Sequence, residues 1–84
     1  MSEKKCKVTV EIYGENYALK GDVEPERIME VAELLDVRMK QTARGNPRLS
    51  AARIAVLTAL NITDEYLRLE KDYKQLVQML KGDK

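Results

Sequence analysis

The sequence predicts an α+β protein, in which a small head of one β-hairpin and one helix precedes a long C-terminal coiled-coil helix. Three observations lead to this fold class. Apolar and polar residues alternate between positions 8 and 20, the pattern of a half-buried hairpin. Apolar residues then recur at helical spacing from 28 to 39. From Ala55 to Leu80 they follow an unbroken heptad pattern, which requires a partner helix to cover it.

Residues 1–6 are predicted to form a disordered tail and residues 7–49 the head. The alternation at 8–12 and again at 17–20 predicts two strands that fold back on each other. The segment Gly14-Glu15-Asn16 is predicted as the turn between them, because Gly and Asn tolerate positive φ. An isolated two-stranded hairpin is marginal in water, so it needs a covering element.

The covering element is predicted to be a helix over about residues 25–43. Pro25 suits the first helical position, and Gly45, Asn46 and Pro47 end the pattern. The face expected to cover the hairpin consists of Ile28, Val31, Ala32, Leu35 and Met39.

A second helix is predicted over residues 50–81, with Ser50 as its N-terminal cap and residues 82–84 as a frayed end. About 31 residues at ~1.5 Å each make a rod of roughly 46 Å, longer than a small head can cover. The heptad line, called the seam below, consists of Ala55, Ala59, Ile62, Tyr66, Leu69, Tyr73, Leu76 and Leu80. The predicted oligomer interface comprises Leu57, Leu60, Asn61, Ile62, Tyr66, Leu69, Tyr73, Leu76 and Leu80.

Asn61 is a polar residue in an apolar part of this helix. An amide near a helix interface often fixes the register of the partners at some cost in stability. The alternative is a locally satisfied side chain without a special role.

Length and composition limit the class of protein. The 84 residues can build only a marginal core, so oligomerisation is an expected source of stability. The single cysteine, Cys6, indicates a reducing compartment. No stretch approaches the roughly 20 apolar residues of a membrane span, and no apolar signal core begins the chain. We therefore expect a cytoplasmic protein that does not enter the membrane.

The chain carries few groups suited to catalysis. It has no His, the commonest general base and metal ligand, and Cys6 has no His to activate it. No Gly-rich phosphate loop occurs. Asp64 and Glu65 are neighbours on a helix and point about 100° apart, so they cannot form a paired acid/base site alone. They are expected on a solvated or interface-rim face. We predict that the protein is not an enzyme and needs no cofactor or metal.

Positive charge is concentrated between residues 37 and 63, which hold five basic residues and no acid. They are Arg38, Lys40, Arg44, Arg48 and Arg53. The whole chain has 15 basic and 14 acidic residues, so the remainder carries a net charge of −4, which disfavours general nucleic-acid binding. The stretch either docks an acidic protein surface or a phosphate backbone, or simply solvates two helix ends and a loop.

Three motifs resemble the ZapA family of bacterial cell-division proteins, which associate with the FtsZ ring. They are Ala59-Leu60-Asn61-Ile62 continuing to Glu65-Tyr66, Val10-Glu11-Ile12-Tyr13-Gly14, and Leu35-Asp36-Val37-Arg38-Met39. Together they cover about residues 7–70 in the family's order. The chain is similar to short members with a truncated coiled coil.

The resemblance implies a homodimer with hairpins paired across it, and stalks that associate dimers into an antiparallel tetramer. Such a tetramer carries FtsZ-binding heads at both ends and can bridge two filaments at mid-cell. Asn61 is then a dimer-interface residue. The nearest candidates for FtsZ contacts are Arg38, Lys40, Arg44 and Arg48, whereas Ala43, Pro47 and Ala52 stand where longer members often carry charges.

Two other functions remain open at this point. A small nucleic-acid-binding regulator would use the same basic stretch, and would bind duplex DNA with a steep salt dependence. An oligomerisation module for a different partner would use only the seam.

Overall fold

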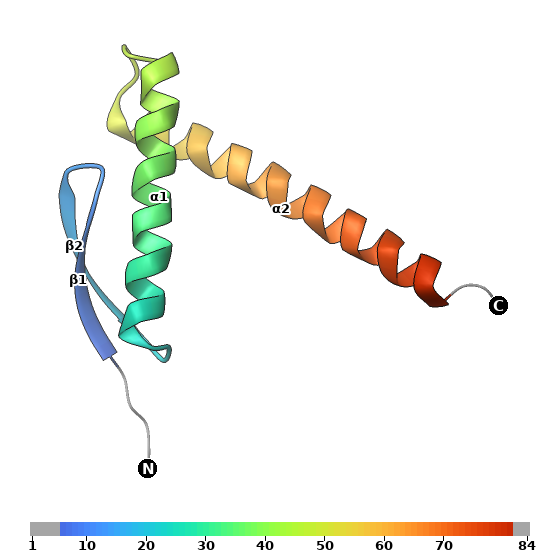
Figure 1. Ribbon diagram of the computed structural model, residues 1–84. Coiled ribbons are helices and arrows are strands. Elements are labelled where there is room, and N and C mark those ends of the chain that lie inside the picture. Colours follow the sequence, from blue (N-terminus) through green and yellow to red (C-terminus); the bar gives the residue numbers. More distant parts are fainter. Residues whose placement is uncertain (1–5, 82–84) are drawn as a thin grey trace.

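The computed structural model describes residues 6–81, which form a hairpin followed by two helices. Strands β1 (Cys6–Ile12) and β2 (Glu15–Gly21) precede helices α1 (Pro25–Gly45) and α2 (Ala51–Lys81). The hairpin lies along α1, and α2 leaves α1 at a wide angle, so that its C-terminal end is far from the head (Figure 1). The molecule is flat, with extents of 52 × 47 × 14 Å. The predicted α+β fold class is confirmed.

The predicted tail and frayed end, residues 1–5 and 82–84, lie outside the described residues. Cys6, placed in the tail by the sequence pattern, is instead the first residue of β1, because its backbone pairs with Gly21.

The hairpin turn is one residue earlier and shorter than the sequence pattern suggested. The antiparallel register pairs Val10 with Tyr17 and ends with Ile12 opposite Glu15, which leaves only Tyr13 and Gly14 as the turn. Both have positive φ, 51° and 83°, as in the two-residue turns whose twist matches that of the strands. The prediction that Glu15 and Asn16 belong to the turn is therefore wrong, because pairing continues through both.

A carboxylate of α1 fixes this turn. The backbone N–H of Tyr13 donates to Asp36 Oδ1 at 2.7 Å, and Lys40 Nζ contacts Asp36 Oδ2 at 2.9 Å. The Tyr13 hydrogen bond, and then Lys40, hold the pKa of Asp36 below its ordinary value. A bulky residue rarely adopts positive φ, so the hydrogen bond that Tyr13 donates to Asp36 helps to hold Tyr13 there.

Helix α1 starts at Pro25, as predicted, and extends two residues past the predicted end. Asn46 closes it, since its backbone N–H donates to Ala43 O at 3.0 Å and its side chain donates to Thr42 O at 2.9 Å. Ser50 caps α2 as predicted, because its Oγ accepts the backbone N–H of Arg53 at 3.3 Å.

The core of the single chain is small. Among the described residues only four apolar side chains are buried: Val10, Ala32, Met39 and Ile54. They come from β1, α1 and the first turn of α2, so the packing that holds the head together ends near the start of the long helix. So few buried side chains make the isolated chain thermodynamically marginal.

We expect Asp36→Asn to lower the urea midpoint at pH 7, because the amide is a weaker acceptor for the Tyr13 N–H and loses the Lys40 ion pair. The folded-state pKa of Asp36 is lowered, so its stabilisation is present above the unfolded-state pKa of about 3.9 and is lost as the pH falls through the folded-state pKa. The difference in urea midpoint between the variant and the parent should therefore disappear at acid pH. Glu33→Gln, an exposed change on the same helix, is the control. A gap that persists at acid pH would contradict the anchoring role.

Candidate functional site

The structure divides the basic stretch into two groups. Arg38 forms a bidentate ion pair with Glu65 of α2, in which Nη1 donates to Oε1 at 3.0 Å and Nη2 contacts Oε2. Lys40 is paired with Asp36. These contacts raise the pKa of both basic groups through hydrogen bonding to the carboxylates. Acids that flank the stretch in sequence, Asp36 and Glu65, therefore neutralise two of its five basic residues in space.

The other three basic residues remain on the surface where α1 passes into α2. Arg44 lies in the last turn of α1, Arg48 in the connecting loop and Arg53 in the first turn of α2. All three are exposed, and none forms an ion pair with a carboxylate of residues 6–81. We call them the basic corner. The first turn of α2 contains no acidic residue, so positive charge at this corner is not neutralised locally.

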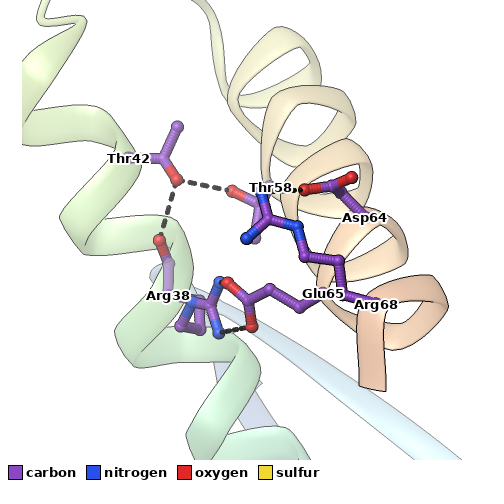
Figure 2. A network of polar contacts seen from close by, with 6 residues as sticks. All are labelled: Arg38, Thr42, Thr58, Asp64, Glu65 and Arg68. Carbon is purple, nitrogen blue, oxygen red and sulfur yellow. Dashed lines mark hydrogen bonds and ion pairs between the residues drawn. The ribbon is translucent and has the colours of Figure 1, made fainter. Parts of the chain in front are cut away.

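A set of polar contacts joins α1 to α2 (Figure 2). Thr58 Oγ1 lies 3.1 Å from Thr42 Oγ1 and 2.8 Å from Ile54 O, and Thr42 Oγ1 donates to Arg38 O at 3.0 Å. Thr58 is only 1% exposed, so its hydroxyl requires these partners. Together with the Arg38–Glu65 ion pair, the Thr42–Thr58 contact forms what we call the polar clamp.

The sequence pattern did not identify the polar clamp. Glu65 was placed on a solvated or rim face, whereas its carboxylate reaches α1, and hydrogen bonding to Arg38 lowers its pKa. The only signal available in the sequence was the three acids that flank the basic stretch, Asp36 before it and Asp64 and Glu65 after it.

The predicted interface residues lie on the surface of the single chain. Leu57 and Ile62 are half-buried, and Leu60 and Asn61 are exposed. The C-terminal seam residues are between 52% and 78% exposed: Tyr66, Leu69, Tyr73, Leu76 and Leu80. A line of large apolar side chains with this exposure is unusual on a protein that stays monomeric.

An apolar groove extends this surface into the head. It runs between the hairpin, α1 and the start of α2, and its lining includes Tyr17, Leu35, Met39 and Ala55. Ala55 is the first residue of the seam, so the groove opens onto the seam. The uncovered apolar surface therefore continues from the hairpin to the end of α2.

No group of three or more His, Cys, Asp or Glu side chains within residues 6–81 is arranged to hold a metal ion. Neither helix of this region combines the length and the apolar character that a membrane span needs.

A small α+β head followed by a long helix with an uncovered apolar edge is the architecture of a protein that works as a subunit of a larger assembly. Its exposed seam and groove are suited to another helix, and its basic corner to an acidic surface.

The chain belongs to the ZapA family, since the family model described as cell division protein ZapA matches residues 8–82. The ZapA protein of Geobacillus sp. (strain WCH70) is 38% identical over 82 residues, which cover 98% of this chain and 94% of the relative. That of Geobacillus kaustophilus is 40% identical, over 98% of this chain and 90% of the relative.

A solved structure has the same fold. The mutant ZapA dimer from Geobacillus stearothermophilus matches with a TM-score of 0.74 and 37% identity, over 96% of this chain and 94% of that chain. The family resemblance of the three motifs is thus confirmed.

We expect Thr58→Val to lower the free energy of unfolding by about 1 kcal/mol, because the buried hydroxyl hydrogen bonds are lost while the volume is kept. Thr63→Val, the same change at an exposed position of the same helix, is the control. Urea unfolding at one fixed protein concentration measures both, since concentration itself shifts the stability of an oligomer. Equal losses in the two variants would contradict a stabilising role for the Thr42–Thr58 contact.

Proposed function

We propose that this chain is a non-enzymatic cytoplasmic scaffold of bacterial cell division that binds FtsZ at mid-cell and bridges FtsZ filaments as a homo-oligomer. The observation that carries the proposal is the continuous apolar surface along the groove and the seam, which a single chain leaves uncovered. The solved relative is a dimer of a mutant, which supports a homo-oligomer here. The names of the relatives support a role in cell division.

The mechanism is multivalency. A dimer presents two heads, and a tetramer joined through the stalks presents heads at both ends. Individually weak contacts become effective when one rigid particle engages two filaments at once, because the second contact forms at a high effective concentration. Such a scaffold needs only a docking surface and a stable assembly, and no catalytic group.

The docking surface for FtsZ is the basic corner. Arg44 and Arg48 of the four sequence candidates belong to it, and Arg53 joins them. Exposed guanidinium groups that no carboxylate of residues 6–81 pairs with are available to bind carboxylates of another protein. Arg38 is paired with Glu65, and Lys40 is paired with Asp36. A contact of either residue with FtsZ would therefore have to break an existing ion pair.

The two rival functions predict different results. A nucleic-acid-binding regulator would also use the basic corner, and a gel shift with duplex DNA at two salt concentrations separates it from a protein-binding scaffold. The apolar surface favours the scaffold, because nucleic-acid binding gives no reason for an uncovered seam. An oligomerisation module for another partner predicts the same particle mass but no sedimentation with FtsZ.

We expect Leu69→Glu or Leu76→Glu to reduce a tetramer to dimers, because a charge in the seam loses its water without gaining a partner. Gln78→Glu, which adds the same charge on the side of α2 away from the seam, should leave the mass unchanged. Light scattering at matched concentration measures the mass of each. An unchanged mass in the seam variants would remove these residues from the assembly.

We expect Arg44→Glu combined with Arg48→Glu to weaken sedimentation with polymerised FtsZ while the particle mass stays constant. Addition of Arg53→Glu should weaken it further. The control is Lys7→Glu combined with Lys20→Glu, two exposed lysines paired across the hairpin, which changes the net charge by the same amount. Normal bundling by the arginine variants would exclude the basic corner, and no sedimentation of the parent protein would exclude the function itself.

A further inference from the structure

The packing between head and rod is confined to the first turns of α2. Ile54 and Thr58 are the only buried residues of that helix, at 0% and 1% exposure. Every described residue after Thr58 is exposed or half-exposed. The close contact between α1 and α2 is thus a short patch, and a short patch alone allows one helix to swing against the other.

A second contact lies further along the rod. Glu65 follows Thr58 by seven residues, which is about 10 Å along a helix. Its partner Arg38 lies one turn before Thr42 on α1. The two contacts therefore join the same pair of helices at two separated points, and Figure 2 shows both in the space between α1 and α2. A single point of contact would allow α2 to rotate against α1, whereas two separated points fix the angle between the two helices.

The chemistry of the second contact suits that role. A guanidinium group meets a carboxylate through two parallel N–H···O bonds, which restrict orientation as well as distance. The side chains of Arg38 and Glu65 are 25% and 52% exposed, so the pair is partly open to solvent. An ion pair of this exposure contributes little to folding stability, and its effect should appear in geometry instead.

We propose that Arg38 and Glu65 are positioning residues, whose ion pair sets the angle between the head and the rod while Ile54 and Thr58 form the pivot. The helix continues for 23 residues beyond Thr58, to Lys81, a lever of about 35 Å. A swing of about 10° at the pivot would move the end of that lever by about 6 Å. Where the proposed bridging function holds, this angle also sets the spacing between docked filaments.

The test is a distance measurement between the two helices of the full chain. Nitroxide labels on Gln41→Cys of α1 and Gln78→Cys of α2, both exposed positions, in a Cys6→Ser background report the angle by double electron–electron resonance. Labelled chains are diluted with unlabelled ones, so that only distances within a chain are measured. The variant is Glu65→Gln. The control is Arg68→Gln, which breaks the exposed Asp64–Arg68 pair (3.0 Å) without touching α1.

We expect the parent and Arg68→Gln to give the same narrow distribution, and Glu65→Gln to shift or broaden it by an amount on the order of 6 Å. Coincident distributions in all three would overturn the proposal. If Glu65→Gln loses helix by circular dichroism, the parent in about 1 M salt is the decisive sample, because the Debye length falls there to about 3 Å. Salt should then broaden the parent distribution, and an unchanged distribution overturns the proposal.

The consequence for filaments is tested separately by electron microscopy of FtsZ bundles. A changed helix angle with a changed filament spacing supports both proposals. A changed angle with unchanged spacing leaves the ion pair as the angular restraint and overturns its role in setting the distance between filaments, whereas the absence of bundles with the parent protein overturns the bridging function.

Discussion

This molecule is dominated by the imbalance between a long apolar edge and a small head. Four buried apolar side chains hold the described part of the chain together, and none of residues 59–81 is buried. In that part of α2, α1 contacts Glu65 through its ion pair with Arg38 and leaves the apolar edge exposed. A core of this size is marginal, so the free energy missing from the single chain must come from apolar area buried against other copies. Assembly and folding are then coupled.

The charged residues fall into two groups: those paired within the chain, and those left unpaired on the described surface. Asp36 accepts a hydrogen bond from the hairpin turn and forms an ion pair with Lys40, and Glu65 forms an ion pair with Arg38. Each acid lies close to the end of the basic stretch in sequence and neutralises one cation within it. What remains is the basic corner, at the junction of the two helices, whereas the large exposed seam residues from Tyr66 to Leu80 lie further along α2. A docking site at the corner would therefore not overlap the C-terminal half of the seam.

The sequence was sufficient to predict the elements, because periodicity and capping are local. Pro25, Asn46 and Ser50 mark helix ends through contacts within a few residues, and the structure places them there. The turn was predicted at Gly14-Glu15-Asn16 because Gly and Asn both tolerate positive φ. In the structure Ile12 pairs with Glu15, so the strands leave only Tyr13 and Gly14 for the turn. The polar clamp was not predictable, since Arg38 and Glu65 are 27 residues apart and meet only through the angle between two helices.

Apolar and polar contacts contribute differently to such an assembly. Burial of the seam is favourable in proportion to area and has little directional preference, so it brings copies together without fixing where each head points. The partly exposed Arg38–Glu65 ion pair contributes little free energy, but its two parallel bonds are strict in geometry. A scaffold that must hold two partners at a defined separation needs both kinds of contact. In this chain the polar clamp ends at Glu65, and the large exposed side chains of the seam lie beyond it, from Tyr66 to Leu80. A substitution in one part should therefore change geometry without changing mass, and a substitution in the other should change mass first.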